Sequence, residues 1–190
     1  MALFSWAKPK LLSVDKNLSA DQRIYFISDL HLGDGTRSDC FMGKDNELMR
    51  LIEQIQLERA HLVIVGDAID LHQAWWMSRV IKAHARLMRA LSLLANDLGV
   101  TYIWGNHDFD ISLFRDLLQF DVCSRLTIDD VALVQHGYEY DPFIGPNLEQ
   151  SHVATRVHHF LERMLDSWIR LPLENFYNIE NRMAFWCFHK

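Results

Sequence analysis

Residues 23–31 read RIYFISDLH, a short apolar run that ends in Asp29, Leu30 and His31. A run of β-branched and aromatic residues without polar interruption favours a buried strand. Three later stretches repeat this plan of an apolar run followed by polar residues: HLVIVGD at 61–67, VTYIWGNHD at 100–108 and VALVQHG at 131–137. The sequence therefore predicts several buried strands, each followed directly by side chains that can do chemistry.

Between these runs the apolar residues change to helical spacing, for example Leu48, Leu51, Ile52 and Ile55. In chain order, we predict strands at 23–28, 61–65, 100–104, 122–128 and 131–135, and helices at 45–59, 77–98 and 112–120. The last two strands are joined by a tight turn at Asp129-Asp130. The alternation of strands and helices predicts an α/β fold, with a largely parallel sheet covered by helices and an antiparallel pair after it. Residues 1–22 are expected to form a loose or packed lead-in.

Length, charge and cysteine content restrict the class of protein. A chain of 190 residues suits a single domain with its own core. The net charge of −6 argues against bulk nucleic-acid binding, although bound metals would still attract a phosphate substrate. The three cysteines, Cys40, Cys123 and Cys187, form no CxxC pair, and no apolar run is long enough to span a bilayer. We therefore expect reduced thiols, no transmembrane segment and a cytoplasmic location.

The polar residues that follow the strands are of the kinds that bind transition metals. Ligand sites of open α/β sheets lie at the carboxyl ends of the strands, so these side chains should meet at one edge. Carboxylate and imidazole together bind Mn, Fe or Zn, and one carboxylate can bridge two cations. Two cations about 3.5–4 Å apart can hold the attacking and leaving oxygens of a phosphoryl transfer, and a water bound to them ionises near neutral pH.

Four motifs in this order resemble the signature of the calcineurin-like metallophosphoesterases: Asp29-x-His31, Gly66-Asp67, Gly105-Asn106-His107-Asp108 and His136. The likeness extends over residues 24–137. It implies a two-sheet β-sandwich flanked by helices, and hydrolysis of a phosphomonoester or phosphodiester at a dinuclear metal centre with a bridging hydroxide. Two divalent ions are implied, with Mn as the leading metal and Fe or Zn as alternatives.

The resemblance also implies a role for each matching residue. Asp29 and His31 would bind the first metal, Asp67 would bridge both, and Asn106 and His136 would bind the second. His107 would act on the substrate phosphate, by stabilising charge or protonating the leaving oxygen, and Asp108 would orient its ring. The same residues also have simpler interpretations, in which His31 is an ordinary loop histidine, Asp67 caps a helix and Asn106 forms a turn.

Two further residues are candidates for supporting roles. Asp70 lies three residues after Asp67 and is expected to order the loop or a ligand histidine from outside the first coordination layer. Arg37 is the candidate for substrate binding, because a guanidinium group matches the geometry of phosphate. The alternative for both residues is a solvated loop without a direct part in the site.

Within the family, residues 27–35 and 66–70 resemble the bacterial branch that contains the UDP-diacylglucosamine hydrolases. Those enzymes typically carry Arg where His107 stands in this chain. The family signature ends in Gly-His-x-His, which this sequence does not contain. Three explanations remain open: the chain is shortened, the site is completed by other groups, or activity is impaired.

The last part of the chain, residues 148–190, is rich in aromatic residues at helical spacing. We expect residues 1–190 to form one metallophosphoesterase domain that is incomplete at its C-terminus, with 148–190 as a helical cap or interaction segment. The expected partner is a phosphate-ester substrate, either a small molecule or lipid-linked, and two copies could associate through the aromatic helices. The alternative function is a catalytically impaired scaffold that acts through protein interaction.

Overall fold

The computed structural model describes residues 15–19, 23–141, 157 and 160, and within them it shows a mixed α/β fold with two sheets. The larger sheet has four parallel strands in the order β2-β3-β4-β5. These strands are β2 (Ile24–Ile27), β3 (His61–Val65), β4 (Val100–Ile103) and β5 (Asp121–Cys123). All four residues of β4 and the first four of β3 are buried, as expected for parallel strands that are covered on both faces.

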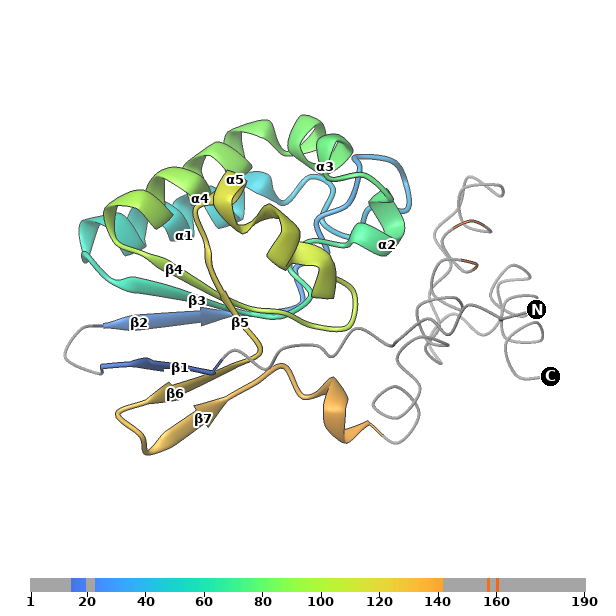
Figure 1. Cartoon of the computed structure of the whole chain (residues 1–190). Helices are drawn as coiled ribbons and strands as arrows, with labels where there is room; N and C mark the ends of the chain where they lie inside the picture. The colour runs from blue at the N-terminus through green and yellow to red at the C-terminus, as the bar shows by residue number, and fades with distance from the viewer. Residues whose placement is uncertain (1–14, 20–22, 142–156, 158–159, 161–190) are drawn as a thin grey trace, which may run out of the picture.

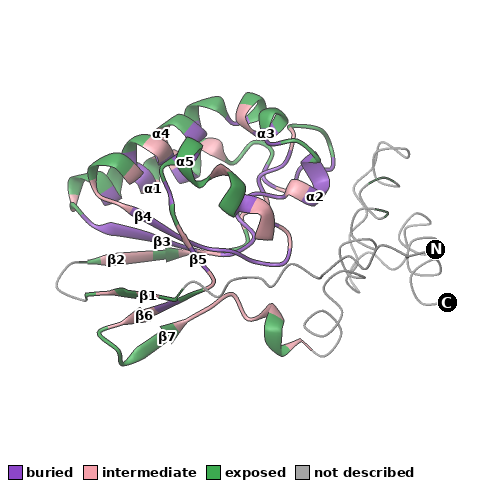
Figure 2. Cartoon of the chain, in the orientation of Figure 1, coloured by how far each residue is buried: buried purple, intermediate pink, exposed green. Residues whose placement is uncertain are grey.

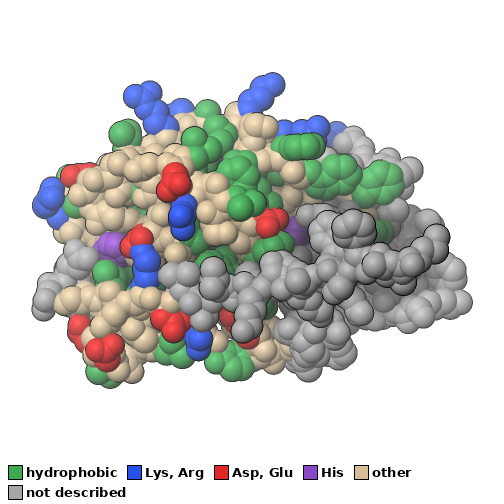
Figure 3. Space-filling view, in the orientation of Figure 1, with side chains coloured by type: hydrophobic (Ala, Val, Ile, Leu, Met, Phe, Trp, Pro, Cys, Tyr) green, Lys and Arg blue, Asp and Glu red, His purple; other side chains and the backbone are tan. Residues whose placement is uncertain are grey.

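Helices cover one face of this sheet, and a second sheet lies against the other (Figure 1). The helices are α1 (Asp45–Leu57), α2 (Leu71–Ala74), α3 (Met77–Ala83), α4 (Ala85–Asp97) and α5 (Arg115–Leu118), with 3₁₀ turns η1 (Phe109–Phe114) and η2 (Tyr138–Tyr140). Basic side chains stand mostly along this helical layer in the view of Figure 3, whereas acidic ones are spread over both layers.

The second sheet contains β1 (Asp15–Leu18), β6 (Arg125–Ile128) and β7 (Ala132–Val134) in the order β1-β6-β7. β1 runs parallel to β6, and β6 pairs with β7 as an antiparallel hairpin. Asp129 and Asp130 connect the hairpin with φ values of 50° and 56°, the left-handed conformation that tight hairpin turns need. The predicted antiparallel pair and its turn are thus confirmed.

Strand β3 shows how one sequence pattern serves two cores. Leu62 and Ile64 lie in the large apolar cluster beneath the helices, whereas Val63 packs with Ile103, Cys123 and Leu126 between the two sheets. Successive side chains of a strand point to opposite faces, so an uninterrupted apolar run covers both. The buried residues are accordingly concentrated in the central strands β3 and β4 and on parts of the helices (Figure 2).

Several predicted boundaries were wrong. The expected strand at 122–128 is divided at Ser124 into β5 and β6, which belong to different sheets. The expected helix at 77–98 breaks at His84, whose φ of −115° and ψ of 38° are not helical. Part of the expected lead-in is a strand, because residues 15–18 pair with β6. The expected helix at 112–120 is the end of η1 followed by the short α5.

The predicted helical segment at 148–190 lies outside the described residues apart from Val157 and Phe160, which are helical and about half exposed. Within the described ranges, none of the helices has both the length and the apolar character that a membrane span requires.

Candidate metal centre

The metal-binding candidates meet at the carboxyl edge of the parallel sheet, where two loops run side by side. The backbone N–H groups of Asp29, His31 and Leu32 donate to the carbonyl groups of Gly66, Asp67 and Ala68, at 3.1, 2.9 and 2.8 Å. The loops after β2 and β3 therefore continue the parallel pairing beyond the strands. This pairing fixes the separation between the DxH and GD motifs.

Three of the candidate residues have a backbone conformation that residues other than glycine rarely adopt. The φ values of Asp29, His31 and Asp67 are 54°, 51° and 51°. Such left-handed residues cost free energy and persist only where the surrounding hydrogen bonds hold them, which occurs most often at functional sites. These three strained residues are among those that the sequence analysis predicts to be metal ligands.

Asp29, Asp67 and His136 form the first group, in which one potential ligand atom from each residue lies within 4.8 Å of the others. His136 Nε2 is 3.2 Å from Asp67 Oδ2, and its Nδ1–H donates to the carbonyl oxygen of Val65 at 3.0 Å. The backbone therefore fixes one nitrogen of the ring, and the other is directed at the Asp67 carboxylate. Metal-binding histidines are commonly oriented in this way.

Two glycines make this close approach possible. A Cβ atom on Gly105 would lie 2.1 Å from Asp67 Oδ1, and one on Gly66 would lie 2.3 Å from His136 Nδ1. Both distances are far shorter than any non-bonded contact, so a side chain at either position would displace a candidate ligand. The glycines of the two motifs thus keep space for the ligand side chains.

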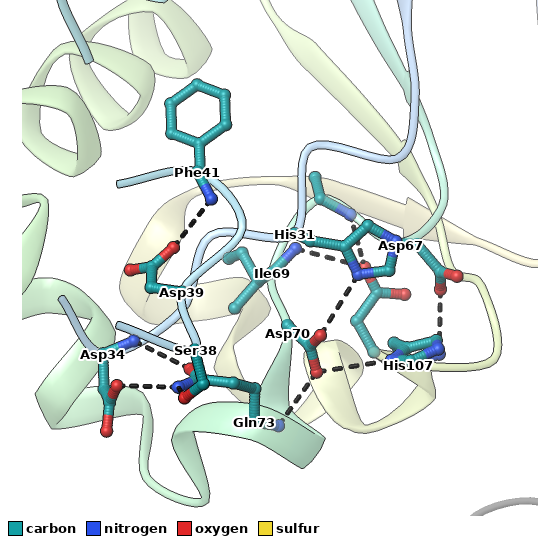
Figure 4. Close-up of polar contacts among 12 residues, drawn as sticks. His31, Asp34, Ser38, Asp39, Phe41, Asp67, Ile69, Asp70, Gln73 and His107 are labelled. Atoms are coloured by element: carbon teal, nitrogen blue, oxygen red, sulfur yellow. Dashed lines mark hydrogen bonds and ion pairs between the residues drawn. The ribbon is translucent and has the colours of Figure 1, made fainter. Parts of the chain in front are cut away.

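His31, Asp70 and His107 form the second group, again with potential ligand atoms within 4.8 Å of one another. The two oxygens of Asp70 accept from Nδ1 of His31 at 3.1 Å and from Nδ1 of His107 at 3.3 Å (Figure 4). The two rings meet edge to face with centroids 4.8 Å apart. One buried carboxylate therefore orients both histidines, which is the arrangement that the expected supporting role of Asp70 requires.

Asp108 lies in a different place from the one expected. Its carboxylate is fully buried and accepts from the Tyr102 hydroxyl and from the backbone N–H groups of Gly105 and Ala68, the latter two at 2.6 and 3.0 Å. Asp108 thus joins the GNHD loop to the GD loop. The carboxylate that accepts from the His107 ring is that of Asp70, whereas Asp108 binds the backbone of both loops, and the orienting role expected for Asp108 stays a prediction.

The remaining predicted residues are placed by the same loops. Asn106 is buried between Gly105 and His107, and the backbone N–H of His107 donates to Asp67 Oδ1 at 2.8 Å. Arg37 is exposed in the turn of the long loop between β2 and α1. The structure thus brings the GNHD loop directly against Asp67, whereas Arg37 stands on the surface.

The charges of the site favour a bound cation. Burial alone would lower the pKa of His107, but the hydrogen bond to Asp70 and the charge of that carboxylate outweigh it and raise the pKa to about 9. The pKa of His136 is also raised to about 9, because the contact with Asp67 outweighs burial. Burial and the charge of Asp67 raise the pKa of Asp108 to about 6. Carboxylates thus raise the pKa of both His107 and His136.

Sequence reasoning missed one histidine beside this centre. His72 is buried, and its ring centroid lies 5.2 Å from that of His107. Asp70-Leu71-His72 repeats the D-x-H pattern of Asp29-Leu30-His31 within the residues that follow Gly66-Asp67. This repeated D-x-H pattern is the feature of the sequence that could have identified His72.

Comparison with known proteins agrees with this geometry. The sequence model of the calcineurin-like phosphoesterases matches residues 22–178. No curated protein and no solved structure matches the chain. The family match spans most of the sequence and includes all the motifs that meet at the sheet edge, so this chain belongs to the calcineurin-like phosphoesterase family.

Proposed function

We propose that this protein hydrolyses a phosphomonoester or phosphodiester at a centre of two divalent cations. The observation that carries the proposal is the convergence of Asp29, Asp67 and His136 at one sheet edge in a member of a phosphoesterase family. A bound pair of cations supplies positive charge for the phosphoryl group and lowers the pKa of a shared water, so that hydroxide is the nucleophile.

The residues at this edge fit such a pair of cations. Asp67 would be shared, with Asp29 and His31 on one side and Asn106 and His136 on the other. The fit is supported by the space that Gly66 and Gly105 leave for the ligands. It is also supported by the raised pKa of His136 beside Asp67, because a cation can take the place of a proton there. Mixed carboxylate and imidazole ligands suit Mn²⁺, our first choice, and also Fe or Zn.

His107 is proposed to act on the substrate phosphate. Its Nδ1–H donates to Asp70, and this hydrogen bond and the charge of Asp70 outweigh burial and raise the pKa of the ring to about 9. A protonated imidazole can stabilise negative charge on the phosphate or give a proton to the leaving oxygen. Asp70 would set the direction of this ring and of His31 together, and Arg37 would contact the phosphate.

The substrate is proposed to be a small or lipid-linked phosphoester. The likeness of residues 27–35 to the bacterial branch of UDP-diacylglucosamine hydrolases supports a lipid-linked nucleotide as one candidate, and His107 is the point of departure from that branch. The scaffold alternative depends on residues 148–190, most of which lie outside the described part of the chain.

Turnover of bis(p-nitrophenyl) phosphate and p-nitrophenyl phosphate tests the proposal. Chelation should abolish hydrolysis and Mn²⁺ should restore it. Asp67→Ala should lower kcat/KM by about 10³-fold or more, because both cations lose a ligand. Asp116→Ala is the matched control, since its side chain is 95% exposed, and it should retain full activity. Full metal-dependent activity in a folded Asp67→Ala protein would refute the assignment.

A further inference from the structure

Gln73 joins the candidate metal centre to the long loop that follows His31. Its side chain is buried, and its Oε1 accepts from the backbone N–H of Asp34 at 2.9 Å. Its Nε2 donates to Asp34 Oδ1 at 2.8 Å and to Ser38 Oγ at 2.7 Å, with Thr36 Oγ1 at 3.2 Å. A single amide therefore binds three residues of the turn at 34–38, of which Figure 4 shows Asp34 and Ser38.

The backbone of Gln73 is tied to the centre itself. Asp70 Oδ1 accepts from the Gln73 N–H at 2.9 Å, as the cap of α2. The same carboxylate contacts the rings of His31 and His107. Two residues, Asp70 and Gln73, thus form a continuous polar connection from the candidate catalytic histidine to the loop.

The far side of this loop has a second anchor. Asp39 accepts from the backbone N–H groups of Gly35 and Phe41, and its Oδ2 lies 2.9 Å from Nε2 of His84. The other nitrogen of the His84 ring lies 2.7 Å from Asp45 at the start of α1. The loop is therefore held at both ends by buried polar groups, and the exposed Arg37 lies between them.

We propose that Gln73 is a positioning residue that sets the turn at 34–38, and with it Arg37, relative to the candidate metal centre. The inference rests on the proposed function, because it assigns Gln73 to recognition of the phosphoester. A buried amide that binds three residues of one loop holds that loop in one arrangement, since other arrangements leave buried polar groups without these hydrogen bonds. Small displacements of a positioning group are costly in enzymes.

Gln73→Met tests this role, because Met keeps the length of the side chain and removes its hydrogen bonds. With Mn²⁺ and bis(p-nitrophenyl) phosphate, we expect KM to rise about 10-fold and kcat to change less than about 3-fold. Metal content should stay at the wild-type value. Ser38→Ala, which removes one partner without altering α2, should raise KM in the same direction by a smaller factor. Gln56→Ala, an exposed glutamine of α1, is the control.

A double-mutant cycle separates this role from a general structural one. If Gln73 acts through Arg37, Gln73→Met should change KM by less than about 2-fold in the Arg37→Ala background. Additive effects of the two substitutions, or a joint fall of kcat and metal content in both Gln73→Met and Ser38→Ala, would overturn the inference.

Amide hydrogen exchange of residues 34–39 supplies a readout that needs no turnover. Exchange there should be faster in Gln73→Met than in wild type, and unchanged exchange would overturn the positioning role. An inactive wild-type protein would refute the proposed hydrolysis without deciding the exchange result, so the two failures remain distinguishable.

Discussion

Two buried clusters of this protein combine histidine with carboxylates, and they differ in almost every other respect. At the sheet edge, His136 and His107 face Asp67 and Asp70, beside strained backbone and two glycines that leave room for side chains. In the helical layer, His84 lies between Asp39 and Asp45, and its own backbone φ is −115°. The composition of a cluster alone therefore does not mark a metal centre.

The difference lies in how each cluster satisfies its charges. Both nitrogens of His84 donate to carboxylates, so the hydrogen-bond donors of its ring are satisfied within the cluster. At the sheet edge, strained backbone, an excess of carboxylate groups and the space that two glycines leave for side chains occur together. These features are expected at a site that binds a cation. We interpret the His84 cluster as structural and the cluster at the sheet edge as the site of chemistry. Two substitutions and one change of pH test that division.

Among the tests of this division, the largest effect is expected at Gly105. A Cβ there would meet Asp67 Oδ1 at 2.1 Å and the Asp67 backbone nitrogen at 2.8 Å, so Gly105→Ala should displace the proposed shared ligand. We expect kcat/KM to fall about 100-fold, since misplacement by about 1 Å has effects of that order. Steady-state kinetics with Mn²⁺ and metal analysis measure it.

Gly43→Ala is the matched control for this substitution. Gly43 has a positive φ of 84°, and a Cβ there meets nothing within 4 Å. Gly43→Ala should therefore lose stability through backbone strain and keep its activity. Equal losses of activity in both variants would show that replacing a glycine in general, and not clearance for Asp67, explains the result at Gly105.

The next effect is expected at His84, where it should concern stability. His84→Asn leaves the buried Asp39 carboxylate without its cationic partner, which should lower the free energy of unfolding by about 3 kcal/mol. Metal content and kcat of the folded protein should stay close to wild type. Denaturant unfolding measures the free energy of unfolding, and metal analysis measures the metal content. Loss of metal from the folded variant would contradict the division between a structural and a chemical cluster.

The smallest effect is the pH dependence of that same cluster. Burial would lower the pKa of His84, but hydrogen bonds to Asp39 and Asp45 outweigh it and raise the pKa above its ordinary value of 6.5. The contribution of His84 to stability is therefore fully present below the ordinary pKa of 6.5, and it is lost as the pH rises through the raised pKa. As the pH rises through this raised pKa, wild type should lose more of its free energy of unfolding than His84→Asn does.

At low pH, the stability of this cluster depends on the Asp39 carboxylate. Burial would raise its pKa, but the hydrogen bond from His84 and those from the Gly35 and Phe41 backbone lower it. Its contribution is present above the ordinary value and is lost as the pH falls through the lowered pKa. A difference between wild type and variant that does not vary with pH would contradict a charged His84.

Much of this arrangement could be predicted from the sequence, because strand-forming runs that end in Asp29, Asp67 and Asn106 dictate both the sheet and its functional edge. The division of 122–128 could not, since a bend at Ser124 changes sheets without changing the apolar pattern. The break at His84 depends on Asp39 and Asp45, which are distant in sequence. Asp70 contacts His31, a predicted ligand histidine, but its second contact with His107 could not be predicted, because only the folded loops decide which carboxylate reaches that ring.

The most direct test of the central claim is the metal content per chain, measured by elemental analysis on protein that was purified without chelator. The account predicts two divalent cations per chain in wild type and their loss in Asp67→Ala, with the fold retained. A wild-type chain that binds no divalent cation, even after incubation with Mn²⁺, would contradict it.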